Sequence, residues 1–310
     1  MKQTTNTILM IRPVNFRMNE ETAVNNYFQE EIDLKNAEIN EKATLEFDAF
    51  VEKLKAVGVN VIVENDDKAL NTPDSVFPNN WVSFHENGDV AMYPMFAENR
   101  RRERREAIFL RLEKEGFKIK DIIDYTSAEE EGYFLEGTGS ILLDRVNSIA
   151  YCALSPRADE ELFIEFCEDF EYTPVVFTAN QTVDGKRLPI YHTNVMMCLA
   201  ETFAVICLET IDNKKERKQV VSNLEKTGKK VITITEKQMH QFAGNMLQVR
   251  GQDDALYLVM SQAAHDSLSK SQKDLIEAHC PILSSALTTI ETCGGGSARC
   301  MMAEVFLPKA

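Results

Sequence analysis

The chain has 310 residues, of which 44% are hydrophobic and 27% charged, the balance of a soluble globular protein. Its 34 basic and 49 acidic residues leave a net charge of −15. This charge argues against nucleic acid and membranes as main partners, because both require a positive protein surface. A chain of this length buries enough apolar surface to fold without disulfides or metals.

The N-terminal segment and the cysteines predict a cytoplasmic protein. Residues Met1–Arg12 lack the basic and apolar regions of a signal peptide. The seven cysteines, odd in number and without a CxxC pair, are expected to be free thiols in a reducing compartment. The longest apolar stretch, Val195–Leu208, is too short to cross a bilayer. No zinc-like spacing of histidines and cysteines occurs, so neither a metal nor an organic cofactor is expected.

Five segments show helical periodicity with charged outer faces, and a short apolar or β-branched run follows each of them. Gly58, Gly116 and Gly228 lie at three of the junctions, where a helix C-terminus favours glycine. The helical segments are Ala37–Val57, Glu98–Glu115, Ala158–Phe170, Asn213–Thr227 and Ser269–Ala278. The runs that follow them are Val59–Val63, Phe117–Ile123, Thr173–Thr178, Lys230–Thr235 and Pro281–Ser284. Two more strand-like runs precede most of the helices, such as Asn79–Phe84 with Val90–Met95, and Ser140–Leu143 with Ser148–Leu154.

The predicted helices begin roughly 55–60 residues apart, which indicates an internal repeat. Five strand–strand–helix–strand units predict five short sheets around a centre, with the helices outside, in one α/β domain spanning residues 1–310. The alternative is an ordinary α/β sheet whose elements alternate at similar spacing. A dinucleotide-binding fold is disfavoured, because no GxGxxG motif follows a predicted strand and opens a helix.

The segment Thr292–Cys300 is the strongest candidate for chemistry. Three consecutive glycines, Gly294–Gly296, let the backbone approach a ligand closely. Cys300 follows next to Arg299, and a strand-like run, Met301–Leu307, closes the chain. A thiol beside a fixed cation is expected to have a lowered pKa and to act as a nucleophile. The alternative is a buried cysteine at the start of a strand; the other six cysteines are expected to be core or incidental thiols.

A nucleophilic cysteine needs an acid or base that is distant in sequence and near in space. His192 precedes an apolar run and is the best placed of the five histidines. Glu136 is a lone carboxylate between apolar residues and two glycines, as a site carboxylate often is. The alternative for Glu136 is a solvated glutamate in a surface loop.

Taken together, Glu136, His192 and Cys300 resemble the guanidino-modifying superfamily. It includes arginine deiminases, dimethylarginine dimethylaminohydrolases and amidinotransferases, and the resemblance covers nearly the whole chain. Those proteins carry an EGG-type turn, then a histidine after a strand, then a glycine-rich turn that ends in the nucleophilic cysteine. The resemblance implies a pentein fold, a five-fold pseudosymmetric α/β propeller, and a small amino acid as substrate.

Further segments are similar to substrate-binding segments of these families. Pro73–Asn80 is similar to the DSVF segment of the dimethylarginine hydrolases, which makes Asp74 and Phe77 candidate substrate contacts. Leu154–Arg157 is similar to the LSxRT stretch, whose arginine holds the substrate carboxylate; this role falls to Arg157. We also expect Arg299, beside the nucleophile, to bind substrate.

Three positions depart from the deiminase pattern. Where the deiminases place aspartates around a guanidinium, this chain has Asn80, Gly139 and Asn194. A buried guanidinium without a counter-charge costs several kcal/mol, whereas asparagine offers the donor and acceptor that a neutral ureido group matches. The pattern is similar to a branch described as citrulline-utilisation hydrolases, which implies release of ornithine, ammonia and carbon dioxide.

We therefore predict a thiol hydrolase of a ureido or guanidino amino acid, most simply citrulline, that works through a covalent S-carbamoyl intermediate. Cys300 attacks the ureido carbon, Glu136 orients the substrate, and His192 serves first as acid and then as base. Asn80 and Asn194 join the substrate-binding residues named above. The alternatives are an arginine-derivative deiminase or dihydrolase, an amidinotransferase and, more remotely, a non-catalytic binding propeller. The sequence leaves the oligomeric state open.

Three further features have simpler interpretations. The run Arg100–Arg105 at a helix start is expected to form a solvated helix face. Trp81 is expected to pack in the core or to line the site. Arg12, which ends the first predicted strand, is a candidate to point towards the centre of the repeat.

Overall fold

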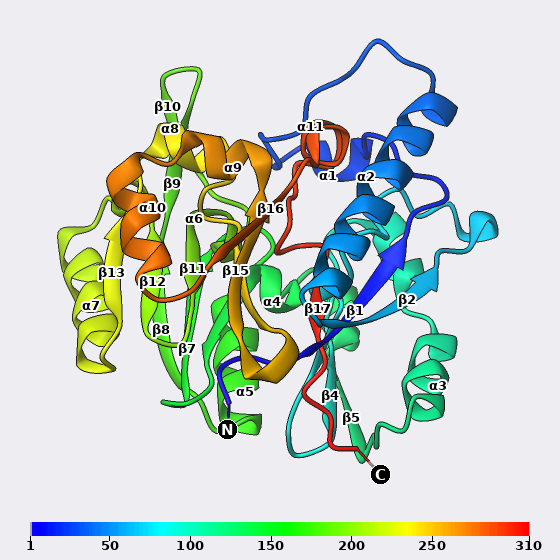
Figure 1. Cartoon of the computed structure of the whole chain (residues 1–310), viewed down its shortest axis with the longest axis horizontal. Coiled ribbons are helices and arrows are strands. Elements are labelled where there is room, and N and C mark those ends of the chain that lie inside the picture. Colours follow the sequence, from blue (N-terminus) through cyan, green and yellow to red (C-terminus); the bar gives the residue numbers. More distant parts are fainter. Residues whose placement is uncertain (1, 310) are drawn as a thin grey trace.

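A computed structural model describes residues 2–309, and across them the strands form five three-stranded sheets and one two-stranded ribbon (Figure 1). Four sheets follow one plan: an antiparallel pair, then a third strand parallel to the second. Their strands are β3 (Val82–Phe84), β4 (Asp89–Met92) and β5 (Asp121–Asp124); β6 (Ile141–Asp144), β7 (Ile149–Leu154) and β8 (Thr173–Thr178); β11 (Met197–Leu199), β12 (Phe203–Ile206) and β13 (Lys230–Thr233); and β14 (Leu247–Arg250), β15 (Leu256–Ser261) and β16 (Ile282–Ser285).

The fifth sheet joins the two ends of the described chain. Strand β1 (Thr7–Arg12) runs parallel to β2 (Asn60–Asn65) and antiparallel to the short C-terminal strand β17 (Ala303–Glu304). The C-terminal strand therefore takes the place that the first strand has in the other four sheets. The ribbon of β9 (Asn180–Val183) and β10 (Lys186–Pro189) is additional to this repeat.

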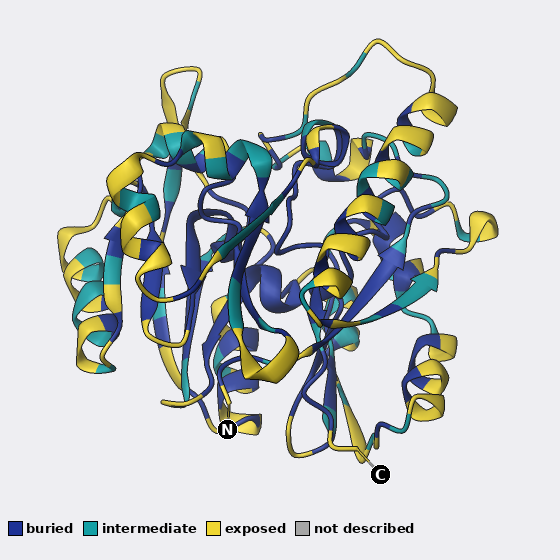
Figure 2. Ribbon diagram, in the orientation of Figure 1, coloured by how far each residue is buried: buried dark blue, intermediate teal, exposed yellow. Residues whose placement is uncertain are grey.

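A helix connects the second and third strands of each sheet, as the repeat predicts. These helices are α2 (Asn36–Ala56), α3 (Glu106–Lys114), α5 (Glu160–Asp169), α7 (Lys214–Lys226) and α10 (Lys270–Glu277). Helices α3, α7 and α10 lie at the edges of the molecule in Figure 1, and Figure 2 shows their outer faces exposed. Gly58, Gly116 and Gly228 take φ values of +85°, +88° and +76° just after three of the helices, which confirms their predicted role as helix terminators.

Three sequence predictions about elements need correction. The predicted helix Glu98–Glu115 is broken, because a short 3₁₀ helix at Glu98–Glu103 is followed by extended backbone at Arg104 and Arg105 before α3 begins. The run Asn79–Phe84 starts as a 3₁₀ turn, η2 (Pro78–Asn80), with the proline at its first position, where its missing N–H costs nothing. In the run Met301–Leu307, the strand β17 has only two residues.

Three short helices lie between strands and are close in sequence to the candidate site residues Glu136, His192 and Cys300. They are α4 (Gly137–Ser140), α6 (Thr193–Met196) and α11 (Thr288–Gly294). Helix α4 lies near the centre of the molecule in Figure 1 and contacts both η2 and α6. The remaining helices are α1 (Glu20–Ala23), α8 (Glu236–Met239) and α9 (Gln262–Ser267). Within residues 2–309, no helix combines the length and apolarity needed to span a bilayer.

Candidate functional site

The glycine-rich turn begins at the end of α11 and leads to Cys300, six residues beyond Gly294. Gly295 takes a φ of +61°, a conformation that side chains with a Cβ rarely adopt. A Cβ on Gly294 or Gly296 would lie 2.8 or 2.9 Å from atoms of the Phe77 ring. Two of the three glycines are thus needed because the predicted contact residue Phe77 packs directly against the turn. The Cys300 N–H then donates to the Ser297 carbonyl at 3.0 Å.

Glu136 and His192 form a buried acid–imidazole pair. Glu136 precedes α4 and His192 precedes α6, and the contact between these helices brings Oε2 within 2.7 Å of Nε2. Burial alone would raise the pKa of Glu136, but the charge of Arg157 and the hydrogen bond from His192 hold it at about 2. Burial lowers the pKa of His192 to about 4 despite the carboxylate beside it. The pair therefore holds a neutral imidazole against an ionised carboxylate at neutral pH.

The Cys300 thiol faces two asparagine side chains. Asn194 Nδ2 lies 3.5 Å and Asn245 Nδ2 3.2 Å from Sγ. Burial raises the pKa of this thiol and outweighs both the hydrogen bonds around it and the charge of Arg299, which lower it, so the predicted net lowering of the pKa is wrong. Asn194 was a predicted site residue; Asn245 was not, since it lies in an unremarkable stretch between α8 and β14.

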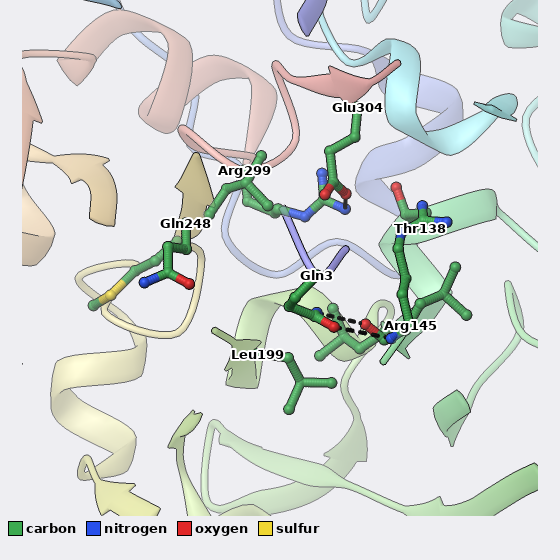
Figure 3. Close-up of a pocket in the computed structure, with 11 residues that line it drawn as sticks. Gln3, Thr138, Arg145, Leu199, Gln248, Arg299 and Glu304 are labelled. Carbon is green, nitrogen blue, oxygen red and sulfur yellow. Dashed lines mark hydrogen bonds and ion pairs between the residues drawn. The ribbon is translucent and has the colours of Figure 1, made fainter. Parts of the chain in front are cut away.

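Arg299 points away from the thiol that it precedes. Its guanidinium donates to the Met302 carbonyl at 2.8 Å and to Glu304 Oε2 at 2.9 Å. It lines a separate cavity of about 20 Å³, together with Gln3 and Arg145 (Figure 3). The structure thus does not bring Arg299 together with the other predicted substrate-binding residues.

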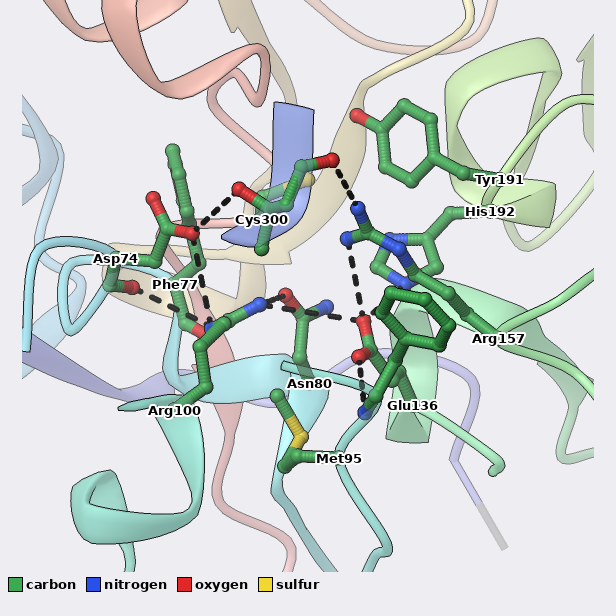
Figure 4. Close-up of polar contacts among 12 residues, drawn as sticks. Asp74, Phe77, Asn80, Met95, Arg100, Glu136, Arg157, Tyr191, His192 and Cys300 are labelled. Atoms are coloured by element: carbon green, nitrogen blue, oxygen red, sulfur yellow. Dashed lines mark hydrogen bonds and ion pairs between the residues drawn. The ribbon is translucent and has the colours of Figure 1, made fainter. Parts of the chain in front are cut away.

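Arg100 occupies the centre of the site, contrary to its predicted place on a solvated helix face. Only 2% of its surface is exposed, and it forms a two-bonded ion pair with Glu103 at 2.9 and 3.0 Å. Its Nη1 donates to Asn80 Oδ1 at 2.8 Å and its Nη2 to the Phe77 carbonyl at 3.1 Å (Figure 4). Burial raises the pKa of Glu103 to about 7, against the opposing charge of Arg100. Arg100 thereby fixes both Asn80 and the Phe77 backbone.

Arg157 and Asp74 both form hydrogen bonds to an N-terminal segment, residues 22–25, which we call the cover. The Arg157 Nη2 donates to the Thr22 carbonyl and its Nε to Asn25 Oδ1, both at 2.8 Å. The Thr22 hydroxyl donates to Asp74 Oδ2 at 3.1 Å, and the second carboxylate oxygen of Asp74 is buried without a hydrogen-bond partner among the described residues. Cys300 is therefore only 2% exposed beneath this cover.

Two other sequence predictions concern residues outside the site. Trp81 is fully buried and packs edge-on against Phe109 at 6.2 Å, so it belongs to the core. Arg12 pairs with Asp48 at 2.7 and 2.8 Å in a partly exposed ion pair, so it does not point towards the centre. Among residues 2–309, no cluster of three or more potential metal-ligating side chains occurs.

Comparisons with known proteins agree on one family. A family model for eukaryotic N,N-dimethylarginine dimethylhydrolases matches residues 12–307. The structure is similar to apo ArgZ, an arginine dihydrolase from the ornithine–ammonia cycle in cyanobacteria, with a TM-score of 0.74 and 18% identity over 98% of this chain. The chain spans 41% of that protein. None of the curated protein sequences matches it.

Two further solved structures are similar over nearly their whole length. A variant of the N-terminal domain of ArgZ, covalently bound to a reaction intermediate, gives a TM-score of 0.70 at 19% identity and covers 97% of this chain and 99% of that one. A dimethylarginine dimethylaminohydrolase variant, as an adduct with S-methyl-L-thiocitrulline, gives 0.64 at 14% identity and covers 96% and 98%. These likenesses extend the family match to the fold.

Proposed function

The chain belongs to the N,N-dimethylarginine dimethylhydrolase family, whose members hydrolyse C–N bonds of guanidino compounds, and from this we propose that it is a cysteine hydrolase of a ureido or guanidino amino acid. The observation that carries the proposal is the convergence of Cys300 with the Glu136–His192 pair. Helix α6 links the thiol to the acid–imidazole pair. His192, which precedes the helix, contacts Glu136, and Asn194, within the helix, contacts the Cys300 sulfur. A nucleophile, a proton carrier and an orienting carboxylate are the parts that such a hydrolysis needs.

Citrulline is the substrate we propose, on the balance of buried charge. The site holds the carboxyl groups of Asp74, Glu103 and Glu136 and the guanidinium groups of Arg100 and Arg157. Each of these carboxyl groups already has a guanidinium within 4.0 Å, and Glu136 has Arg157 at 3.5 Å and Arg100 at 4.0 Å, so none is left alone to pair with a substrate guanidinium. Citrulline adds no net charge to the site, because its α-carboxylate and α-ammonium groups cancel and its ureido group is neutral.

The two ends of such a substrate have separate partners. The planar guanidinium of Arg157 suits the α-carboxylate, which would replace the Thr22 carbonyl and the Asn25 amide oxygen that now occupy it. The unpartnered oxygen of Asp74 suits the α-ammonium group. The oxygen of the Asn80 side-chain amide is held by Arg100, and its NH₂ group donates one N–H to Asn79 Oδ1 at 3.1 Å, which leaves the other N–H to donate towards the ureido oxygen.

The proposed reaction has two displacement steps at one carbon. The Cys300 thiol gives its proton to the neutral imidazole of His192 and attacks the ureido carbon, and the bond to one nitrogen breaks as His192 delivers that proton to it. His192 then takes a proton from water, which attacks the S-carbamoyl carbon and releases the thiolate. The carbamate product loses carbon dioxide to give the second amine. The products are ornithine, ammonia and carbon dioxide, without a metal or an organic cofactor.

The second candidate is an arginine dihydrolase. It is favoured by the similarity to ArgZ, which is described as such an enzyme, and by Glu136 as an anion near the reacting centre. Amidinotransfer would in addition require an amine acceptor. A non-catalytic binding protein would not need a nucleophile, a histidine and a carboxylate arranged as Cys300, His192 and Glu136 are, which disfavours that alternative. We further propose that the five sheets close around the site as a five-bladed pentein propeller in a single domain.

The test is a panel of citrulline, arginine, agmatine and dimethylarginine, assayed for ammonia and for the amine product. We expect ammonia and ornithine from citrulline, and none with Cys300→Ser. Turnover of arginine without turnover of citrulline would select the arginine enzyme. A requirement for an added amine would select amidinotransfer, and full activity of Cys300→Ser would refute the thiol mechanism.

Whether the site prefers a neutral or a cationic substrate is tested separately, by measuring the dissociation constants of citrulline and arginine. Asn80→Asp, made in a Cys300→Ser background, is expected to weaken citrulline binding, because a carboxylate opposed to the ureido oxygen costs about 1–3 kcal/mol. The same change is expected to strengthen arginine binding. Asn87→Asp, on an exposed turn between β3 and β4, adds the same charge outside the site as a control. Equal shifts for both ligands would contradict the neutral-substrate argument.

A further inference from the structure

The side-chain amide of Asn245 is held in one orientation against the thiol. Its Oδ1 accepts the backbone N–H of Arg299 at 3.0 Å, which identifies the other end as the NH₂ group. That group donates to the Asn194 carbonyl at 3.0 Å and to Cys300 Sγ at 3.2 Å. Because Asn245 is fully buried, each of its donors and acceptors is accounted for within the protein. The N–H directed at sulfur is therefore fixed by the rest of the amide.

The backbone around Asn245 is shaped to bring it this close. A Cβ on Gly244 would lie 2.2 Å from the Val195 carbonyl, so only glycine lets this segment lie against α6. Phe242, two residues before Gly244, takes a φ of +60°, an uncommon conformation for a non-glycine residue. The loop between α8 and β14 thus combines an uncommon backbone conformation with a close backbone contact to α6, and it places Asn245 beside the thiol.

Among residues 2–309, no cationic side chain forms a hydrogen bond with the Cys300 sulfur, and the charge of Arg299 lowers the pKa of the thiol without such contact. The Arg299 guanidinium is engaged by Glu304, and the His192 Nε2 is engaged by Glu136. The other side-chain donor, Asn194 Nδ2, lies farther away at 3.5 Å and is shared with the Thr138 carbonyl at 3.4 Å. The amide of Asn245 is therefore the closer of the two side-chain hydrogen-bond donors to the sulfur.

We propose that Asn245 is a catalytic residue whose Nδ2–H donates to the Cys300 sulfur and stabilises the thiolate, both before attack and when the thiolate is released. This inference rests on the proposed function only in taking Cys300 as the nucleophile. The proposed contact is to the sulfur and not to the substrate, and no bond to Asn245 forms or breaks. Its effect is thus expected on the sulfur and on kcat, with KM unchanged.

The decisive variant is Asn245→Asp. The carboxylate keeps the acceptor for the Arg299 N–H but has no hydrogen to donate to sulfur, and its charge opposes the thiolate. Asn245→Ala removes donor and acceptor together. Gln248 offers a matched control, because its buried Nε2 donates to the sulfur of Cys280 at 3.4 Å, and Gln248→Glu makes the same exchange at a thiol outside the site.

The measurement is the pH profile of Cys300 alkylation by iodoacetamide, read from the labelled peptide by mass spectrometry. Its midpoint, unlike the absolute rate, does not depend on how often the cover opens. We expect the midpoint to rise by at least one pH unit in Asn245→Asp and by less in Asn245→Ala, with kcat at least tenfold lower and KM within twofold. Gln248→Glu is expected to leave the midpoint unchanged. An unchanged midpoint in both Asn245 variants, with a lowered melting temperature, would assign Asn245 a purely structural role and overturn the proposal.

A second measurement needs no Asn245 variant. In the wild-type chain, the side-chain amide of Asn245 is assigned in an NMR spectrum by its proximity to the Arg299 amide proton. We expect its proton signal to move with the titration of the thiol and to stay constant in Cys300→Ser; a constant signal in both would overturn the proposal. Lack of turnover by the wild-type chain would refute the proposed function and leave both thiol measurements valid.

Discussion

Replacing Glu291 by glutamine tests whether a buried carboxyl beneath the nucleophile turn makes folding depend on pH. Glu291 lies in α11 and is 5% exposed; its Oε1 accepts the Ser297 hydroxyl at 2.6 Å. Burial raises its pKa from 4.5 to about 7, opposed by hydrogen bonds from Ser261 and Ser297 and reinforced by the charge of Glu46. Glutamine keeps an oxygen for the Ser297 hydroxyl and cannot ionise.

The sign of the effect follows from proton binding. Between pH 4.5 and 7 the folded chain holds a proton on Glu291 that the unfolded chain has lost, so stability falls as pH rises through this range. A difference of roughly 2.5 pKa units corresponds to about 3 kcal/mol. The wild type is thus expected to lose about 3 kcal/mol of unfolding free energy relative to Glu291→Gln as pH rises from 4.5 to 7.

Urea unfolding of both proteins at pH 5, 6, 7 and 8 measures this difference, because all other titrating groups are common to the two chains and cancel. Glu225→Gln, on the exposed face of α7, is the matched control for removing one carboxylate. Parallel stability curves for the wild type and Glu291→Gln would refute the reasoning, since the carboxyl would then titrate alike in both states. We expect the variant to keep its activity, because the Ser297 contact that supports the turn is retained.

Three more predictions concern the site. Arg157→Lys should raise KM tenfold or more, on the order of 1.4 kcal/mol, because lysine cannot hold a carboxylate with two parallel hydrogen bonds; steady-state kinetics with an unchanged KM would contradict this. Arg100→Met should cost about 3–5 kcal/mol in urea unfolding by leaving Glu103 buried without its partner, and adding Glu103→Leu should recover part of the loss. A double variant no more stable than the single one would count against that ion pair. Asn25→Ala should speed alkylation of Cys300 by loosening the cover, and an unchanged rate would show that Asn25 does not hold it closed.

The repeat and the nucleophile turn could be predicted from sequence because both depend on local physics. Helix α7 matches its predicted segment closely, since an asparagine cap at Asn213 and a glycine at Gly228 bound a periodic apolar face. Gly295, before Cys300, likewise marks a backbone conformation that residues with a Cβ rarely adopt. Such signals lie within a few residues of the structure that they determine, so no distant contact is needed to interpret them.

The tertiary structure decided which polar side chains form the site. Arg100 lies in a basic run that reads as solvated, yet Glu103, Asn80 and the Phe77 carbonyl together allow its charge to be buried. Arg299 adjoins the nucleophile in sequence but turns to Glu304. Asn245 carries no sequence signal at all and reaches the thiol because its loop packs against α6. The burial of a charged or amide group depends on partners from distant segments, and only the packed chain brings those partners together.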